Sequence, residues 1–166
     1  MSEPWPRGRS RHGGIDQIPL PTGVPGRLWL AGKHYVGPDG PAALASVGAT
    51  AVVCLCEPFE YEHRYPDYAV WVKDTGITWP VHDLHAPDRP EATRLVEAVT
   101  GRLDAGDGLI VHCGAGLGRA GTIAAAVLLH YGVSLDDALS TISAARPGAG
   151  PQSDVQLELL KHLSNS

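Results

Sequence analysis

The sequence predicts one α/β domain built on a mainly parallel sheet of four to five strands flanked by helices. Its 166 residues are enough to enclose one hydrophobic core. Hydrophobic residues make up 43% of the chain and charged residues 19%, which are ordinary values for a globular protein. Short apolar runs alternate with segments of helical periodicity, and this alternation is typical of parallel strands joined by helices.

The expected strands are short and apolar or β-branched, and they cover residues 27–31, 50–56, 77–81 and 109–111. The run at 50–56 (TAVVCLC) is typical of a central strand buried on both faces. The expected helices, several with proline or serine at the start, cover residues 41–47, 67–73, 90–103, 123–129, 134–144 and 152–163. Residues 1–26 are rich in Pro, Gly and Arg and are expected to form a partly disordered tail, which places the domain at 27–166.

Charge and composition exclude several classes of partner. The formal net charge is −5 and no basic run marks a nucleic-acid footprint, so no nucleic-acid partner is expected. No apolar run approaches the length of a membrane span. Three cysteines and the lack of an apolar N-terminal signal segment indicate a cytoplasmic protein. The high content of Gly, Ala and Pro favours a bacterial source, and a monomer is expected.

Residues 109–129 (LIVHCGAGLGRAGTIAAAVLL) place a glycine-rich turn between an apolar strand and an apolar helix. Backbone N–H groups and the helix dipole favour an anion at such a turn. Cys113 ends the strand, and Arg119 follows in the first turn of the helix. Glycines let a loop point successive N–H groups at one tetrahedral anion, while arginine forks two donors onto its oxygens. The same groups favour the thiolate form of Cys113, which makes it a phosphorus nucleophile.

Two other interpretations of the turn fit less of the sequence. The residues from Gly116 to Gly121 match G-x-G-x-x-G, but no strand follows to complete a dinucleotide-binding unit. A nucleotide-binding P-loop would need Lys-Ser/Thr after the glycines, and this pair is absent. Rhodanese-type sulfur transfer and arsenate reduction also use a cysteine loop, but Arg119 followed by Gly121-Thr122 favours phosphate.

The run HCGAGLGRAGT, from His112 to Thr122, resembles the HCxxGxGRxGT signature of the cysteine-dependent protein tyrosine phosphatases, closest to the dual-specificity branch. The resemblance implies a tyrosine phosphatase-like fold in which Cys113 attacks phosphorus and Arg119 holds the phosphoryl oxygens. The amides of the intervening loop would bind the substrate, and this loop comprises Gly114, Ala115, Gly116, Leu117 and Gly118. His112 and Thr122 are expected to support the site. The implied reaction requires no metal and no organic cofactor.

The same resemblance extends along residues 27–163. The segment PVHDLHAP at 80–87 is similar to the acid loop of compact dual-specificity enzymes, which implies that Asp83 is the general acid. Asp88 is the nearest competitor, but it faces a helix cap. His82, His85 and Asp83 lack a further ligand cluster, so no metal is expected there. Arg146-Pro147 and the later Gln156 resemble the end of this fold, and Gln156 is expected to support the site.

Ala120 departs from the usual pattern, because most relatives carry Ser or Thr after the loop arginine. The hydroxyl at that position stabilises the cysteine thiolate when the phosphoenzyme is hydrolysed. The phosphatase of regenerating liver group also carries Ala there and is similar in the acid loop. We therefore expect a slow second step in which phosphocysteine accumulates. The hydroxyl of Thr122 is expected to bond its own helix backbone rather than replace the missing one.

Cys56 is a possible redox partner of Cys113, because certain relatives form a reversible disulfide from the matching position. The alternative is that Cys54 and Cys56 are both small buried hydrophobes. Their side chains are expected to point to opposite faces of the sheet, so that at most one of the two faces the loop.

The expected substrate is a phosphorylated protein or peptide, with phosphotyrosine favoured. Gly114, Ala115 and Leu117 fill the variable loop positions without a lysine, which disfavours a phosphoinositide. Two alternatives stay open, a slow or non-catalytic module that traps phosphorylated ligands and a phosphatase acting on phosphoinositides or small molecules.

Overall fold

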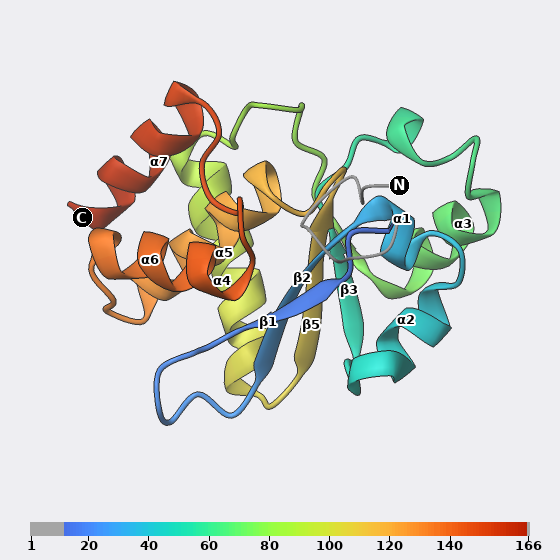
Figure 1. The fold of residues 1–166 in the computed structure, drawn as a ribbon, viewed down its shortest axis with the longest axis horizontal. Helices are drawn as coiled ribbons and strands as arrows, with labels where there is room; N and C mark the ends of the chain where they lie inside the picture. The colour runs from blue at the N-terminus through green and yellow to red at the C-terminus, as the bar shows by residue number, and fades with distance from the viewer. Residues whose placement is uncertain (1–11, 166) are drawn as a thin grey trace.

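The computed structural model describes residues 12–165 of the chain. Five strands form one sheet in the order β1-β2-β5-β3-β4 (Figure 1). Their bounds are Ile15–Ile18 (β1), Arg27–Gly32 (β2), Ala51–Cys54 (β3), Ile77–Thr78 (β4) and Gly108–Cys113 (β5). Only the edge strand β1 is antiparallel to its neighbour. The prediction of a mainly parallel sheet of four to five strands is confirmed.

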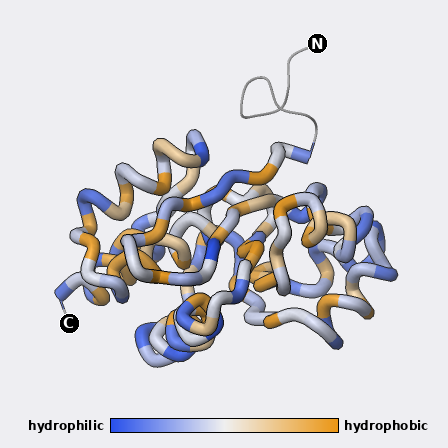
Figure 2. Tube along the Cα trace, turned by 90° about the horizontal axis from the view of Figure 1, so that it is seen from below, coloured by the Kyte–Doolittle hydropathy of each residue, from blue (hydrophilic) through white to orange (hydrophobic). Residues whose placement is uncertain are grey.

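Helices cover both faces of the sheet, and the two groups lie on opposite sides of it in Figure 1. One face carries α1 (Lys33–Val36), α2 (Gly40–Val47) and α3 (Pro66–Thr75). The other carries α4 (Arg89–Asp104), α5 (Gly118–His130), α6 (Leu135–Ala145) and α7 (Asp154–Ser164). Each face encloses its own apolar cluster, the larger one around the nearly all-buried α5. Figure 2 shows hydrophobic segments running through the middle of the molecule.

Three short elements were not expected from the sequence. They are β1, α1 and the 3₁₀ helix η1 (Pro58–Glu60). Residues 1–11 of the expected tail lie outside the described residues, whereas β1 lies in the remainder and pairs with β2. The strand expected at 77–81 is shorter, because Pro80 has no N–H to give to a ladder. Trp79 and Val81 still donate to the backbone of residues 54 and 55, which carries the chain along the sheet edge.

The topology brings the candidate residues to one end of the sheet. Strands β3 and β5 are parallel neighbours, so their carboxyl ends meet, and Cys54 and Cys113 are their last residues. The first turn of α5 and the segment after β4 begin at the same end. Ligand sites in open α/β sheets lie at such carboxyl ends. Within residues 12–165, no helix is both long and apolar enough to cross a bilayer.

Candidate active site

The loop between β5 and α5 turns its carbonyl groups outward. The carbonyl of Gly114 accepts from the Lys33 N–H at 3.0 Å, and that of Leu117 accepts from the N–H groups of Gly121 and Gly150. The buried Arg146 donates to the carbonyls of Ala115 and Gly116, each at 3.0 Å. Because these four consecutive carbonyls are bonded to the surrounding structure, the loop amides are left to face the inside of the turn. The result is a cradle for an anion.

Glycine is required at two points where the loop meets its surroundings. Gly116 has a φ of +77°, and a Cβ there would also overlap the Ala31 carbonyl of β2. A Cβ on Gly121 would overlap the backbone of Gly150. These contacts hold the loop against β2 and α5 against the segment that precedes α7. The glycine pattern seen in the sequence therefore reflects close backbone packing as well as loop curvature.

Cys113 lies at the base of this loop, with its side chain 2% exposed. Its Sγ accepts a hydrogen bond from the Ala120 N–H at 3.4 Å. The donor is a backbone amide in the first turn of α5, where the helix dipole favours negative charge. The sulfur therefore lies at the bottom of the cradle, bonded to an amide of the helix N-terminus.

Arg119 is buried beside the thiol and is held in a fixed orientation. Its Nη1 and Nη2 each donate to one carboxylate oxygen of Glu60 at 2.8 Å, and Nη1 also donates to the Val81 carbonyl at 2.8 Å. A guanidinium has five N–H groups, so the Nε–H and the second Nη2–H remain for a ligand. These two point in the same direction along one edge of the group. Two parallel N–H donors of this kind form a fork that matches two oxygens of a phosphate or carboxylate.

The charges around Arg119 and Glu60 reinforce each other. Burial lowers the pKa of Arg119, but the hydrogen bonds and charge of Glu60 together with the charge of Cys113 more than offset this, so the pKa is raised. Burial raises the pKa of Glu60, but the hydrogen bonds from Arg119 and from the Glu57 N–H reverse this and leave it lowered. Both groups are therefore charged near neutral pH, and the guanidinium stays cationic under the loop.

Asp83 lies on the segment after β4, two residues beyond the Val81 carbonyl that accepts from Arg119. One of its carboxylate oxygens is 3.6 Å from Nη2 of Arg119, and its side chain is 71% exposed. The carboxylate is thus next to the Arg119 edge that is left for a ligand. Asp88 is instead the N-cap of α4 and accepts from the Glu91 N–H at 2.9 Å.

The segment that carries Asp83 is tied to α7. The buried Gln156 donates from Nε2 to the His85 carbonyl at 3.1 Å and accepts from the Gln152 N–H at 2.7 Å. The Ser153 hydroxyl donates to the Leu84 carbonyl at 2.6 Å, and Leu84 has a φ of +66°. A leucine in this region of backbone space is strained. The two bonds from α7 therefore stabilise a loop conformation that the local sequence disfavours.

The other two supporting residues expected from the sequence have clear partners. The Thr122 hydroxyl donates to the Gly118 carbonyl at 2.7 Å, within its own helix. The fully buried His112 has Nδ1 3.2 Å from the Cys113 carbonyl and Nε2 2.5 Å from the Tyr68 hydroxyl. Since a carbonyl only accepts, Nδ1 carries the proton and Nε2 accepts from Tyr68. His112 thereby fixes the backbone that presents Cys113.

The three cysteine thiols are free and buried. Cys54 and Cys56 both lie in the cluster on the α1–α3 face, whereas Cys113 packs with the cluster on the other face. The expectation that Cys54 and Cys56 point to opposite faces of the sheet is wrong. Residues two apart along a strand share a face, and both thiols lie on the α1–α3 side. The disulfide between Cys56 and Cys113 stays a prediction.

Sequence reasoning missed Glu60 and gave Arg146 no role. Glu60 comes shortly after β3, the strand next to β5, and so lies at the carboxyl end of the sheet, where site residues gather. Its position in the sequence relative to this strand was the signal that could have identified it. Its side chain also accepts from the Glu57 N–H at 2.8 Å in a capping box around η1.

A family model for the DSP-PTPase phosphatase domain of the Swiss Army Knife proteins (PTP-SAK) matches residues 24–162. The chain belongs to this family. Protein tyrosine phosphatase type IVA 3 of Bos taurus and that of Mus musculus are each 34% identical to it over 110 residues. These matches cover 64% of this chain and 60% of each relative's length. The resemblance to cysteine-dependent phosphatases of the dual-specificity branch is confirmed.

Solved structures show the same fold. Tk-PTP in its active form is 26% identical, with 90% of this chain and 97% of that chain covered and a TM-score of 0.68. Kinase associated phosphatase, with serine in place of its catalytic-site cysteine, is 24% identical, with 92% and 94% covered and a TM-score of 0.74. The tyrosine phosphatase-like fold expected from the sequence is confirmed.

Proposed function

We propose that the chain is a phosphate monoester hydrolase of the protein tyrosine or dual-specificity type, acting through a phosphocysteine on Cys113. The observation that carries the proposal is the cradle itself. Four outward-bonded carbonyls, those of residues 114–117, leave the amides of residues 115–118 facing inward, over a buried thiol and beside a guanidinium with one edge left for a ligand. This arrangement suits a dianionic phosphate ester approached from below by sulfur.

The first step joins Cys113 to phosphorus. The Sγ thiolate attacks, the S–P bond forms, and the P–O bond to the leaving group breaks on the opposite side. The Nε and Nη2 edge of Arg119 and the loop amides hold the three equatorial oxygens, whose charge changes most in the transition state. Asp83 lies next to the same edge and donates its proton to the leaving oxygen.

The second step hydrolyses the phosphocysteine. Asp83, now a carboxylate, takes a proton from the attacking water, and the S–P bond breaks to release inorganic phosphate and the thiolate. The leaving thiolate is stabilised by the Ala120 N–H, but the Ala120 side chain offers no hydroxyl. Thr122 does not replace it, because its hydroxyl is bonded within α5. This step therefore limits turnover.

The substrate is a phosphorylated protein or peptide, with phosphotyrosine preferred. The family is one of protein phosphatases, and residues 114, 115 and 117 add no cationic side chain to hold further phosphates. We place the enzyme in the cytoplasm, because its three cysteines are free thiols and thiols persist in reducing compartments. We propose that it acts there as a monomer.

The experiment that tests this proposal compares matched peptides carrying phosphotyrosine or phosphothreonine. We expect the phosphotyrosine peptide to be hydrolysed faster, and Asp83→Asn to lower its rate about 10²–10⁴-fold. Asp88→Asn is the matched control, because asparagine also caps a helix, and its rate should equal that of the wild type. Equal losses in the two variants would contradict the role of Asp83.

A second candidate function is favoured by Ala120. A module with a very slow second step would take one phosphoryl group onto Cys113, release the dephosphorylated peptide and stop. In that case the wild type releases a single equivalent of dephosphorylated peptide with almost no inorganic phosphate, whereas Cys113→Ser holds the phosphotyrosine peptide intact.

A further inference from the structure

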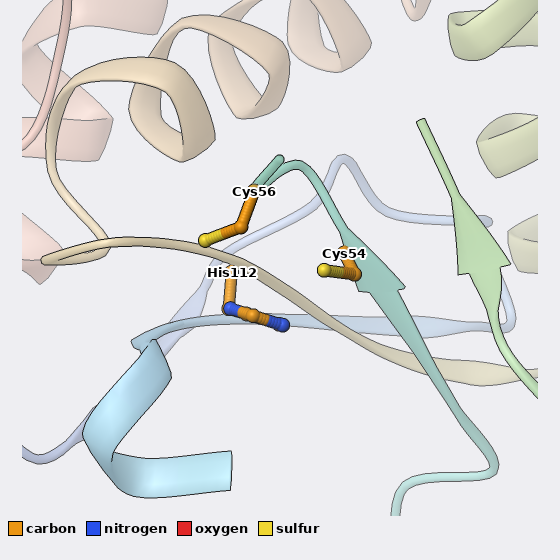
Figure 3. A group of neighbouring side chains, drawn as sticks. All are labelled: Cys54, Cys56 and His112. Atoms are coloured by element: carbon orange, nitrogen blue, oxygen red, sulfur yellow. The ribbon is translucent and has the colours of Figure 1, made fainter. Parts of the chain in front are cut away.

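Cys54, Cys56 and His112 form a buried cluster outside the proposed reaction. Figure 3 shows the three side chains grouped together, with the cysteines from β3 and the residues just after it and the histidine from β5. The two sulfur atoms and one imidazole nitrogen all lie within 4.8 Å of one another. Their exposures are 0%, 1% and 0%. Within residues 12–165 this is the group whose donor atoms come close enough to share one ion.

The sheet builds this cluster without strain in the chain. Cys54 and His112 are direct partners in the parallel register of β3 and β5, so their side chains project side by side. Cys56 follows Cys54 by two residues and falls on the same face. The Leu55 N–H donates to the His112 carbonyl at 2.9 Å and fixes the backbone between the two thiols. The donor atoms are thus positioned by strand pairing rather than by mobile loops.

The histidine has the tautomer that a metal ligand needs. Nδ1–H is bonded to the Cys113 carbonyl, so Nε2 presents its lone pair toward the cluster, where the Tyr68 hydroxyl now donates to it. Metal-bound histidines characteristically donate their second ring N–H to a carbonyl or carboxylate, which fixes the ring.

Cysteine binds metals as the thiolate, so a cation at this cluster would take the place of the proton on each of the two thiols. Both sulfurs are buried beside the histidine ring, where they can reach one ion together.

We propose that Cys54, Cys56 and His112 bind a thiophilic cation, Zn²⁺, through two sulfurs and Nε2. Two thiolates and one imidazole are a typical zinc donor set, and zinc accepts three protein ligands with a fourth position left to another donor. Binding forms two Zn–S bonds and one Zn–N bond, releases the two thiol protons to solvent, and displaces the Tyr68 hydroxyl from Nε2. The ion ties β3 to β5 at the end of the sheet that carries Cys113.

The test must separate this site from the nucleophile, because Cys113 is also a thiol. Metal binding is therefore measured in the Cys113→Ser protein with Co²⁺ as a spectroscopic probe, under anaerobic conditions without added thiols. The expected result is a single equivalent of Co²⁺ that gives thiolate-to-metal charge-transfer absorption and is displaced by Zn²⁺. A folded Cys113→Ser protein that shows no such absorption would overturn the proposal.

Variants at the cluster then assign the ligands. Cys54→Ser and Cys56→Ser, each combined with Cys113→Ser, should weaken Zn²⁺ binding more than about 100-fold. His82→Asn is the matched control, because this exposed histidine lies outside the cluster, and it should bind as before. Charge-transfer absorption that survives loss of either Cys54 or Cys56 would overturn the assignment.

A third variant should strengthen Zn²⁺ binding instead of weakening it, and it leaves all three proposed ligands in place. Tyr68→Phe deletes the hydroxyl that competes for Nε2, so Zn²⁺ should bind about tenfold more tightly, the equivalent of one ordinary hydrogen bond. Unchanged or weaker binding in a folded Tyr68→Phe protein would contradict binding through Nε2.

Discussion

Replacing Glu60 with glutamine should disable the site without touching any group that reacts. Glu60 makes two 2.8 Å bonds to Arg119, and the two side chains are 12% and 4% exposed. Breaking such a buried pair costs about 3–5 kcal/mol. We take the low end, about 3 kcal/mol, because Glu60 retains some solvent contact and glutamine keeps one acceptor oxygen.

This energy predicts two measurable effects. If this free energy is what holds Arg119 in the orientation that stabilises the transition state, kcat/KM for an aryl phosphate decreases about 100-fold, since each 1.4 kcal/mol is a factor of ten. The same loss lowers Tm by about 6–12 °C for a chain of this size. Inorganic phosphate should also inhibit the variant less strongly, because it uses the same guanidinium edge.

The stability that Glu60 contributes to the fold should decrease at acid pH. The pKa of Glu60 is lower in the folded state than its ordinary value of 4.5, so its stabilisation is complete above that value and is lost as pH falls through the folded pKa. The Tm difference between wild type and Glu60→Gln should therefore stay constant above about pH 5 and shrink as the pH falls below about 4.5.

Glu62→Gln is the matched control, because Glu62 is an exposed glutamate two residues away. It should leave kcat/KM and Tm unchanged. A Glu60→Gln protein with lowered Tm but wild-type kcat/KM and phosphate inhibition would refute the role of Glu60 in holding Arg119.

Three further substitutions test other parts of the site. Ala120→Ser places a hydroxyl beside the Cys113 sulfur, so the steady-state rate should rise about tenfold in a turnover assay. Thr122→Val removes a hydroxyl bonded within α5, so the ratio of burst to steady rate should stay as in the wild type. Gln156→Leu frees the His85 carbonyl from α7, so kcat/KM, which reports the first step, should fall about tenfold for poor leaving groups with little change in phosphate inhibition.

Local signals in the sequence were sufficient for the sheet and most of the helices. The run TAVVCLC predicts a buried strand, and the apolar helix after Arg119 is nearly all buried in the structure. The candidate nucleophile Cys113 and the candidate arginine Arg119 lie in one contiguous motif, HCGAGLGRAGT, and can be named from it alone. Such features depend on residues that are near one another in the chain.

The parts that sequence reasoning missed depend on contacts between distant segments. Glu60 reaches Arg119 across 59 positions of the chain, and Arg146 reaches the loop carbonyls across about 30. Strand β1 has only four residues and is held by pairing with β2 rather than by its own pattern. The cluster of Cys54, Cys56 and His112 arises from the register of β3 against β5, which no local pattern reveals.

The most direct test of a phosphocysteine on Cys113 is rapid-mixing hydrolysis of an aryl phosphate by the wild type and Cys113→Ser. We predict a burst of phenol equal to the enzyme concentration, then a slow steady rate, with both absent in Cys113→Ser. Phenol release that begins at its steady rate, or a burst that persists in Cys113→Ser, would contradict an intermediate on this thiol.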